Sequence, residues 1–475
     1  MKTTSLLAVA ATIVQTIHGF SIPERRDGLK VVGLETERRA PRNPVHRDKL
    51  RKRGIVSAGL DNQQTLYFVN ATVGTPAKKV MLHLDTGSSD LWVNTPNSAL
   101  CSSNNDPCKY AGTYSANSSS TYEYIGSYFN ISYVDGSGAT GDYVSDTVTI
   151  GGQKIDRLQF GIGYSSSNAQ GILGIGYPIN EVQVGRAKLK PYNNLPAQMV
   201  ASNLIQSQAY SLWLNDIDAS TGTILFGGVD TAKFTPPLQI LPIESSSGVY
   251  AEFLVTLTKL QVNHKTIGGG NLALAVLLDT GSSLSYLPDS LVQEIYNAVG
   301  ATYDPVSNAA YVPCSLARSS SAPNITFTFT SPSITVSMNS LVLDMGPGRT
   351  PTLNGAPACL FGIGPAGSGT SVLGDTFLRS AYVVYDLENN EIALAPTRFN
   401  VTASKVVEIG KGEGAVPDAT RVSNPVRATE GLRGPNGQSE GMTAGAQGMA
   451  EFGALFRSAV VAVGVAVGVG VVVGL

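Results

Sequence analysis

Charged residues are scarce in this chain of 475 residues: Asp, Glu, Lys and Arg together make up 14%, and the formal net charge is −2. A balance this close to neutral gives no electrostatic basis for binding nucleic acid. Hydrophobic residues reach 43%, which is ordinary for a globular protein. The surface must therefore be rich in uncharged polar residues, and this suits an exported, glycosylated protein.

Cysteine is also scarce, with four in the whole chain: Cys101, Cys108, Cys314 and Cys359. In an oxidising compartment these four can pair in three ways. Zinc binding is the competing interpretation, but the chain lacks the closely spaced Cys and His pairs that zinc sites use. We therefore expect disulfides, and neither a metal ion nor another cofactor.

Sequence patterns typical of helices are few. The 51 glycines and 25 prolines favour turns and strands over long helices. From Thr65 onward, short β-type runs alternate with Gly, Ser, Asn and Asp. The best helix candidates are residues 290–296, which carry an apolar stripe just after Pro288, and residues 195–204. The sequence thus predicts an all-β protein.

One motif occurs twice in the chain. The apolar residues 81–84 lead into Asp85-Thr86-Gly87-Ser88-Ser89, and residues 276–278 lead into Asp279-Thr280-Gly281-Ser282-Ser283. A single Asp-Thr-Gly is a weak signal, since Asp and Gly mark ordinary turns. Two identical pentapeptides, each after an apolar run, are a strong one. His83 precedes the first copy, and we place it on the outer face of its strand rather than in the chemistry.

The chemistry of two facing carboxylates explains why the motif is needed twice. Two carboxylates at close range do not both ionise easily, so they share a proton. The ionised partner can take a proton from a water that attacks a peptide carbonyl, while the protonated partner donates to the carbonyl oxygen. Gly87 and Gly281 let the backbone turn close to the carboxylates. The hydroxyls of Thr86, Thr280, Ser88 and Ser282 orient them.

From about Thr65 to about Phe399 the chain resembles the pepsin-type aspartic proteases. Besides the two Asp-Thr-Gly motifs, the resemblance rests on the following segments: Tyr67-Phe68, Gly74-Thr75-Pro76, Leu91-Trp92-Val93, Ile131-Ser132-Tyr133-Val134-Asp135-Gly136-Ser137, Gly171-Ile172-Leu173-Gly174-Ile175-Gly176 and Ser371-Val372-Leu373-Gly374-Asp375. The last two match the apolar-Gly motifs that cross behind each catalytic loop. The resemblance implies two β lobes related by a pseudo-twofold axis, with the active-site cleft between them.

The resemblance also implies roles for single residues. Asp85 and Asp279 become the catalytic pair, and Tyr133 lies at the tip of a flap hairpin over the substrate. The indole of Trp92 is placed to hydrogen-bond the Tyr133 hydroxyl. The implied disulfides are Cys101–Cys108 in the N-terminal lobe and Cys314–Cys359 in the C-terminal lobe.

Two flap residues depart from the common pattern of these proteases. Val134 stands where many members have Gly, which should alter the flexibility of the flap. Asp135 stands where many have Thr or Ser, and with Gly136 it belongs to the substrate-facing turn. A carboxylate there favours substrates with Lys or Arg near the scissile bond. In this feature, and in the membrane anchor expected at its C-terminal end, the chain resembles the fungal yapsins and related cell-surface proteases.

The N-terminal segment carries export and processing signals. Lys2 followed by an apolar run predicts a signal peptide over residues 1–19. Residues 20–53 are rich in Arg, Lys and Glu and poor in aromatics, which behind a signal peptide indicates a propeptide. It contains the basic clusters Arg38-Arg39 and Lys49-Leu50-Arg51-Lys52-Arg53. We predict that a processing protease cleaves after Arg53.

The mature chain then divides into four parts. The N-terminal lobe takes residues 54–238 and the C-terminal lobe residues 239–400. Residues 401–445 are Gly-rich and polar, which predicts a flexible stalk. Residues 446–475 end in the uninterrupted apolar run 459–475, which is at the short limit for a spanning helix. The run has no basic flank after it, and small residues precede it, so a glycosylphosphatidylinositol (GPI) attachment signal is the preferred interpretation.

N-glycosylation is possible at five sequons, each a tripeptide that also occurs by chance. They begin at Asn70, Asn117, Asn130, Asn324 and Asn400.

The sequence therefore predicts a secreted, surface-anchored aspartic endopeptidase with an acidic optimum. Its expected partners are protein or peptide substrates, pepstatin-like inhibitors, the processing protease and a membrane reached through a lipid, and a monomer is expected. A non-catalytic binder on the same fold is one alternative, but it should have lost an Asp-Thr-Gly motif. A structural or adhesive protein of the cell wall is another, and the propeptide argues against it.

Overall fold

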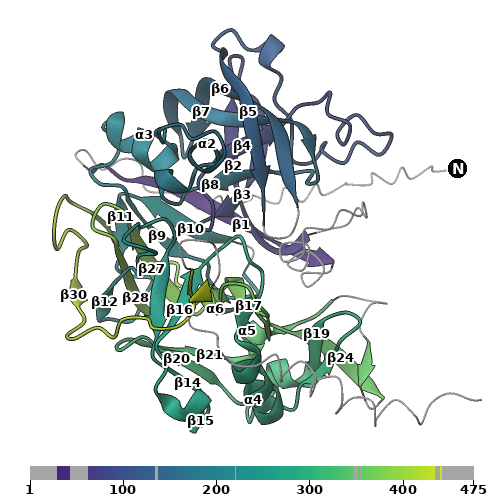
Figure 1. The fold of residues 1–475 in the computed structure, drawn as a ribbon, viewed down its shortest axis with the longest axis vertical. Coiled ribbons are helices and arrows are strands. Elements are labelled where there is room, and N and C mark those ends of the chain that lie inside the picture. The colour runs from purple at the N-terminus through teal and green to yellow at the C-terminus, as the bar shows by residue number, and fades with distance from the viewer. Residues whose placement is uncertain are drawn as a thin grey trace, which may run out of the picture.

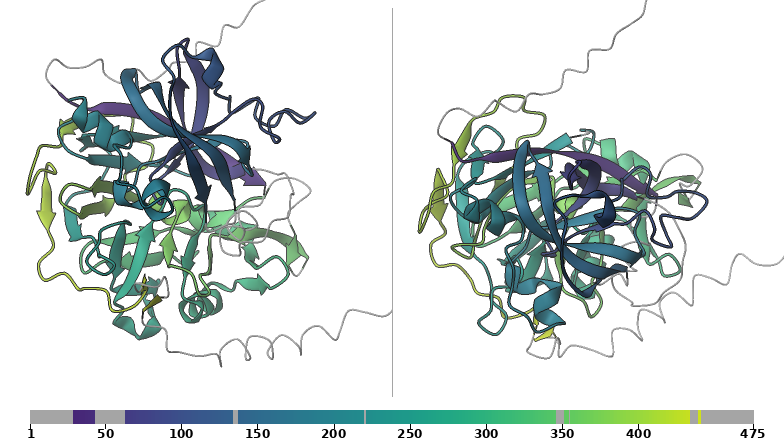
Figure 2. Two further views of the ribbon diagram at one scale, coloured as in Figure 1. Left: turned by 45° about the horizontal axis from the view of Figure 1, so that its top comes forward. Right: turned by 90° about the horizontal axis from the view of Figure 1, so that it is seen from above.

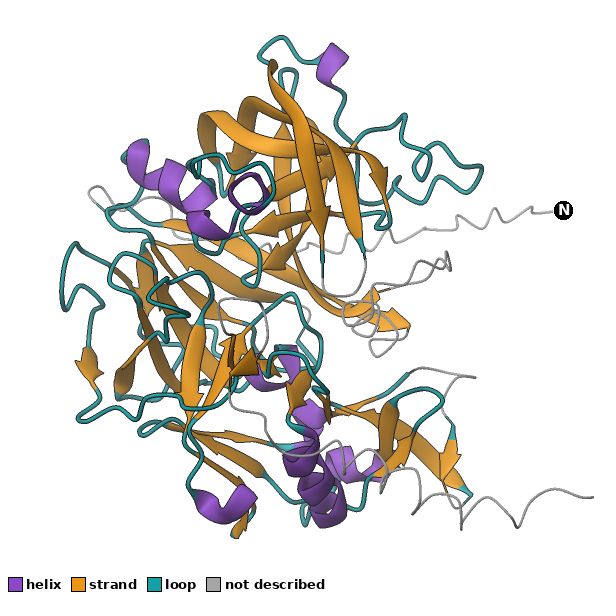
Figure 3. Ribbon diagram, viewed as in Figure 1, coloured by secondary structure: helices purple, strands orange, loops and turns teal. Residues whose placement is uncertain are grey.

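The computed structural model describes residues 29–42, 63–133, 137–219, 221–345, 351–353, 355–433 and 439–440. Figure 1 shows two lobes made of strands, one above the other, with a further layer of strands between them. The helices are short (Figure 3). The prediction of an all-β, bilobal pepsin-like fold is confirmed.

The largest sheet passes from the middle layer into the upper lobe. In spatial order its strands are β30 (Ala419–Arg421), β12 (Leu238–Pro242), β28 (Glu391–Pro396), β27 (Ala381–Asp386), β9 (Ala209–Trp213), β10 (Thr221–Phe226), β1 (Val32–Arg42), β2 (Gln63–Val73), β3 (Lys78–Asp85), β8 (Gly171–Gly174), β4 (Leu91–Asn94), β7 (Gln153–Ser166), β6 (Gly138–Ile150) and β5 (Glu123–Ser132). Strand β2 also pairs with β6, which closes the upper lobe into a barrel-like unit.

Strand β1 connects the two parts of this sheet. It pairs antiparallel with β10 on one side and with β2 on the other. Its purple ribbon crosses the whole molecule in both views of Figure 2. Val32 and Leu34 are buried in the main core, so this strand contributes side chains as well as backbone. The segment that the sequence assigns to the propeptide is thus a central strand of the fold described.

The lower lobe is built from three smaller sheets. The first contains β13 (Leu254–Leu257), β16 (Leu274–Leu278), β26 (Val372–Leu373), β17 (Ser285–Leu287) and β25 (Ile363–Pro365); the second contains β15 (Lys265–Ile267), β14 (Lys259–Val262), β20 (Ile325–Thr328) and β21 (Ser333–Val336); the third contains β18 (Thr302–Asp304), β19 (Ala309–Pro313), β24 (Ala356–Phe361) and β22 (Val342–Leu343), with β23 (Thr352–Leu353) beside β24. Two further pairs are β11 (Gly228–Asp230) with β29 (Val406–Glu408), and β31 (Leu432–Arg433) with β32 (Ser439–Glu440).

The longest described helix confirms the better of the two helix predictions. Helix α4 (Asp289–Val299) begins after Pro288 and ends at Gly300, which adopts the left-handed conformation (φ 71°). Its buried face includes Leu291 and Ile295. The other described helices are α2 (Val182–Gly185), α3 (Leu195–Ala201), α5 (Met338–Leu341) and α6 (Asp375–Leu378), with 3₁₀ turns η1 (Ala116–Ser118), η2 (Pro178–Asn180), η3 (Gly268–Gly270) and η4 (Cys314–Arg318).

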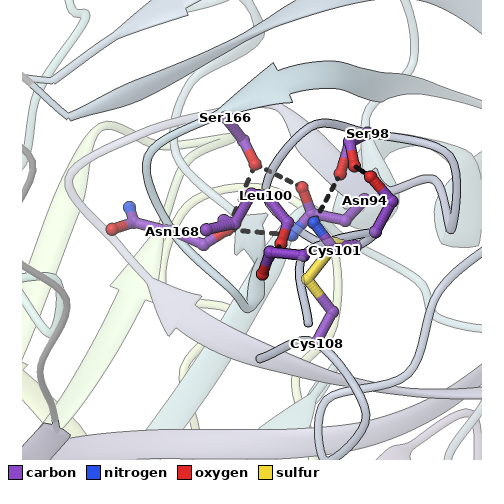
Figure 4. The surroundings of a disulfide bond; sticks show 9 residues. Asn94, Ser98, Leu100, Cys101, Cys108, Ser166 and Asn168 are labelled. Atoms are coloured by element: carbon purple, nitrogen blue, oxygen red, sulfur yellow. Dashed lines mark hydrogen bonds between the residues drawn. A yellow bond between two sulfur atoms is a disulfide. The ribbon is translucent and has the colours of Figure 1, made fainter. Parts of the chain in front are cut away.

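Both implied disulfides are present. Cys101 pairs with Cys108 in a loop of the upper lobe, and Cys314 pairs with Cys359 in the lower lobe. Around the first one, the Ser98 hydroxyl accepts a hydrogen bond from the Cys101 amide (3.1 Å), while the Asn94 amide donates to the carbonyl of Asn168 (2.9 Å; Figure 4). The disulfide loop is therefore held beside the end of β4.

The prediction of a flexible stalk is wrong for residues 401–433. This segment forms β29 and β30 on the body of the protein and buries Ile409, Val416 and Val422. Its Gly-rich, aromatic-poor composition led to the wrong prediction, because three widely spaced aliphatic side chains and a free sheet edge leave no periodic signal in the sequence.

Several predictions concern residues outside the described ranges. They are the signal peptide at 1–19, the processing site at Arg53, flap residues Val134, Asp135 and Gly136, and the terminal segment from residue 441. Among the described residues, no helix has both the length and the apolar character needed to cross a membrane.

Candidate active site

Two buried strands end at the repeated motif. Strand β3 ends with Asp85, and β16 ends at Leu278, one residue before Asp279. Asp85 is 2% exposed and Asp279 is 6% exposed. His83, two residues before Asp85, is 3% exposed and packs against Phe68, with 5.6 Å between ring centroids. The prediction that His83 lies on the outer face of its strand is therefore wrong, because its ring packs in the interior.

Each carboxylate is held by the same pair of hydrogen bonds from its own loop. The Gly87 amide donates to Oδ1 of Asp85 (2.9 Å) and the Ser88 hydroxyl donates to Oδ2 (2.6 Å). In the second loop the Gly281 amide donates to Oδ1 of Asp279 (2.7 Å) and the Ser282 hydroxyl to Oδ2 (2.7 Å). The predicted orienting role of the serines is therefore matched by the geometry in both copies.

The two threonines tie the loops to each other. The Thr86 hydroxyl donates to the carbonyl of Leu278 (2.9 Å) and accepts from the Thr280 amide (3.1 Å). The Thr280 hydroxyl donates to the carbonyl of Leu84 (2.9 Å) and accepts from the Thr86 amide (3.1 Å). Four hydrogen bonds thus form a symmetric cross-link between the lobes at the base of the two carboxylates.

Gly87 allows the closest approach between the two loops. A Cβ atom at this position would lie 2.6 Å from Oδ1 of Asp279, which is shorter than any ordinary contact. The carboxylate of Asp279 therefore rests directly against the loop that carries Asp85. This contact is the physical reason for glycine after the first Asp-Thr, and it brings the two acids into one site.

The apolar-Gly motifs pack behind the loops, as the resemblance implied. Strand β8 lies parallel to β3, and β26 lies parallel to β16. The Ile175 amide donates to the carbonyl of Asp85 (3.1 Å), and the Asp375 amide donates to the carbonyl of Ser282 (2.9 Å). Each loop is thus fixed from behind by backbone hydrogen bonds.

The flap hairpin, made of β5 and β6, is linked to the first loop. The Trp92 indole donates to the Tyr133 hydroxyl at 2.7 Å, which confirms the predicted hydrogen bond. The Tyr133 amide donates to the carbonyl of Ser137 (2.8 Å) across the hairpin turn. Trp92 is fully buried, so it provides a rigid support for the tyrosine.

A buried acidic cluster beside the flap was missed from the sequence. Asp90, the residue after the first pentapeptide, is 1% exposed. Its carboxylate accepts from the hydroxyls of Tyr143 (2.5 Å) and Tyr192 (3.0 Å) and from the amide of Val182 (2.9 Å). Burial raises the pKa of Asp90, and the three donors oppose that shift. Asp90 thereby joins the first loop, the flap strand β6 and the segment around α2.

Glu181 is the second acid of this cluster. It is 1% exposed, and its Oε2 accepts from the Tyr192 amide (2.8 Å). Burial, together with a smaller effect of the nearby Asp90 carboxylate, raises the pKa of Glu181 to about 9. Glu181 is therefore protonated at neutral pH. The only available hint was an acidic residue shortly after the Gly171–Gly174 strand, which does not indicate burial.

The arrangement has the components of acid–base chemistry on a neutral substrate. Two carboxylates face one site, hydroxyl and amide donors fix all four of their oxygens, and a hairpin lies over the first loop. A family model for eukaryotic aspartyl proteases matches residues 66–397. The chain belongs to the eukaryotic aspartyl protease family.

Similar proteins support the same assignment for this aspartyl protease. It is 54% identical to a probable aspartic-type endopeptidase, opsB, of Aspergillus oryzae, over 91% of this chain and 89% of the relative. It is 50% identical to the corresponding OPSB protein of Trichophyton verrucosum over 89% and 88% of the two chains. Secreted aspartic protease 8 of Candida albicans is 36% identical over 74% of this chain and 81% of its own.

Proposed function

We propose that Asp85 and Asp279 hydrolyse peptide bonds by activating a water held between them. The ionised carboxylate takes a proton from the water as it attacks the peptide carbonyl, and the protonated one donates to the carbonyl oxygen. The observation that carries this proposal is the symmetric cradle, in which matching Gly amides and Ser hydroxyls orient both acids. Because the mechanism needs one shared proton, we expect an acidic optimum.

The test uses the purified, processed enzyme and a peptide library at several pH values, with and without pepstatin. Asp85→Asn and Asp279→Asn should each remove turnover while leaving the fold intact, and pepstatin should block the wild type. Asp156→Asn serves as the matched control, because Asp156 lies on the surface with a 62% exposed side chain. Substantial activity in either purified site variant would overturn the assignment.

The unprocessed chain is further proposed to be a zymogen that is cleaved after Arg53. The alternative basic pair, Arg38-Arg39, lies in β1, where Arg38 pairs with Tyr67 of β2. A protease must extract its substrate as an extended strand, so a residue that is paired in a sheet is a poor target. Mature protein should begin at Gly54 by N-terminal sequencing, and Lys52→Ala with Arg53→Ala should block processing. A mature N-terminus at Arg39 or Ala40 would contradict this.

Surface attachment through a GPI lipid is proposed from the terminal apolar run, as in the yapsin-like proteases that the chain resembles. Since residues 401–433 belong to the folded body and β31 pairs with β32 (Ser439–Glu440), a tether has to follow Glu440. Phosphatidylinositol-specific phospholipase should release the enzyme from membranes, and truncation after Glu440 should send active enzyme to the medium. Peptides from Ala459 onward in mature protein would exclude lipid attachment.

A preference for Lys or Arg near the scissile bond is proposed from Asp135. A carboxylate in a closed, poorly hydrated cleft gains more from a cation than an exposed ion pair, which is worth roughly 0–1 kcal/mol. Asp135→Thr should lower kcat/KM for basic peptides and spare apolar ones, with a difference that shrinks at low pH. Equal losses on both peptide classes would mean that Asp135 shapes the flap and does not recognise charge.

N-glycosylation is proposed at the five sequons, whose asparagines are all exposed. Asn70 and Asn130 lie in strands β2 and β5, yet their side chains face outward. Endoglycosidase treatment should lower the apparent mass of the secreted protein, and Asn→Gln variants should reveal which sites carry glycans.

A further inference from the structure

Residues 401–433, here called the C-terminal strap, cross from the middle layer to the lower lobe. Figure 1 shows the strap as the yellow-green chain that passes along the outer side through β30 and ends beside β16. It begins where β29 pairs antiparallel with β11. Its Ile409 and Val416 are buried in a cluster with Trp213 and Phe234. The strap is therefore packed on the body along β29 and at Ile409 and Val416.

Three buried carboxylates of the body hold the strap at separate points. Asp230 accepts from the Ser404 hydroxyl (2.7 Å) and the Lys405 amide (2.7 Å). Glu391 pairs with Arg421 (2.7 Å). These acids are 4% and 6% exposed, so each would be an unfavourable buried charge without its donors.

Glu244 is the third of these carboxylates and lies nearest the lower lobe. It accepts from the Thr256 hydroxyl of β13 (2.7 Å) and from the Ala428 amide of the strap (3.3 Å), and it lies 3.5 Å from Arg427. The same carboxylate therefore bridges the strap and the strand that pairs with β16.

The strap also covers the edges of two strands, β12 and β16, that would otherwise lack a partner there. Strand β30 runs parallel to β12 at the end of the large sheet, and the Val422 amide donates to the carbonyl of Ile240 (3.0 Å). An exposed strand edge presents unpaired amides and carbonyls, so this cover protects the sheet from pairing with another chain.

The second edge belongs to β16, the strand that carries Asp279 at its end. The amides of Thr429 and Glu430 donate to the carbonyl of Ala273 (2.9 and 3.1 Å), and the Ala275 amide donates to the carbonyl of Glu430 (2.8 Å). On the same edge, β26 pairs with β16 at Leu277 and Leu278, further along the strand. The strap thus fills the first half of this edge, where Ala275 is fully buried.

We propose that the end of the strap positions β16 and, through it, Asp279 opposite Asp85. The proposal rests on the catalytic role proposed for Asp279 and makes Glu430 and Gly431 positioning residues. Ala275 is four residues before Asp279 in a strand with a fixed register. A displacement of the backbone at Ala275 therefore also shifts the end of β16 and Asp279. A misplacement of about 1 Å at a reacting group can cost about 10²-fold in rate.

Gly431 allows a test with a single methyl group. It has a φ of +80°, and a Cβ there would lie 2.8 Å from the carbonyl oxygen of Ala275. Gly431→Ala should therefore push the strap away from β16. Gly414→Ala is the matched control, because Gly414 belongs to the same strap, has a φ of +72°, and a Cβ there has nothing within 4 Å.

We expect Gly431→Ala to lower kcat about 10-fold or more with little change in KM, at a temperature where the variant is fully folded. The Ala275 amide should exchange hydrogen faster, and Gly414→Ala should match the wild type in kcat, KM and hydrogen exchange at Ala275. A lower melting temperature with unchanged kcat would overturn the proposal, since the strap would then only stabilise the fold.

A second variant covers the case in which Gly431→Ala does not fold. Arg427→Gln removes the charge that faces Glu244, and its side chain is 60% exposed, so folding is not at risk. Faster exchange at Ala275 together with a lower kcat supports positioning, whereas unchanged kcat overturns it. Asp279→Asn distinguishes the two proposals, because its retention of activity would reject the catalytic assignment whatever the strap does.

Discussion

The two halves of the candidate active site share one pentapeptide and a parallel strand behind it, and they differ in the elements that lie further out. Within each loop the hydrogen bonds to Asp85 and Asp279 match atom for atom. Beyond the pentapeptide, the first half continues to Asp90 and Trp92, which connect it to the flap. The second half has Leu284 in an apolar cluster at the position of Asp90, and its strand β16 is held by the strap.

This difference shows how one local structure can serve two roles. Short-range hydrogen bonds within the pentapeptide fix the geometry around its aspartate. The same geometry therefore appears in both copies of the pentapeptide. Support comes from elements further away: the first loop is coupled to the β5–β6 hairpin, and the second to a segment packed on the body. We expect the first half to respond to changes in the flap cluster and the second to changes in the strap.

The largest expected effect concerns the symmetric hydrogen bonds that Thr86 and Thr280 make between the two loops. Thr86→Val and Thr280→Val each leave one buried amide and one buried carbonyl of the opposite loop without a partner. Each such group costs about 1–3 kcal/mol, so each variant should lose about 2–6 kcal/mol of unfolding free energy in urea denaturation, with a marked loss of turnover. Thr→Ser at the same positions keeps the hydroxyl and should be much milder. If the two valine variants lost clearly different amounts of unfolding free energy, the two threonines would not contribute equally.

The next effect is a pH dependence of stability that comes from Glu181, beside the first catalytic loop. The carboxyl of Glu181 titrates near 4.5 when unfolded and at about 9 when folded. Between these values the folded protein holds a proton that the unfolded chain has released, so stability falls as pH rises, by up to about 1.4 kcal/mol per pH unit. Glu181→Gln should flatten the decline of melting temperature from pH 5 to 8. The exposed Glu123→Gln is the control, and a decline that persists in Glu181→Gln would reject the assignment.

Asp90→Asn should have a smaller effect, confined to the first half. An amide in place of the carboxylate accepts fewer of the three hydrogen bonds from Tyr143, Tyr192 and Val182, and bonds to a charged group are worth about 1.5–3 kcal/mol. Because burial raises the pKa of Asp90, the wild-type carboxyl becomes neutral as pH falls, and the stability difference should narrow. A difference that is constant from pH 7 to 4 would contradict a role for the charge.

The smallest effect concerns the flap contact. Tyr133→Phe removes the acceptor of the Trp92 indole, a bond worth about 0.5–1.5 kcal/mol, so kcat/KM should fall about 2–10-fold. Tyr128→Phe, on strand β5 of the same hairpin, is the matched control and should change kcat/KM little. If both variants behave alike, the hydroxyl of Tyr133 does not support the flap.

The sequence predicted those parts of the site that are coded within a few residues. The loops at Asp85 and Asp279, the supporting serines and glycines, and helix α4 all follow from local motifs and periodicity. The two disulfides and the Trp92–Tyr133 bond came from the family resemblance, since four cysteines alone allow three pairings.

Other features lie beyond any local pattern. Asp90 and Glu181 look like ordinary loop acids, and only their burial gives them raised pKa values. Residues 401–433 have the composition of a linker, yet they pack because three aliphatic side chains and several backbone groups find partners on the body.

The sequence by itself thus determined the family, the all-β architecture and the identity of the two acids, because a repeated motif needs no partner to be recognised. Only the tertiary structure decided that β1 joins the two parts of the large sheet and that the strap ends beside β16. The physical reason is that strand edges and buried polar groups are satisfied by segments far away in the chain. Which segment satisfies them depends on the surface that the rest of the fold leaves uncovered.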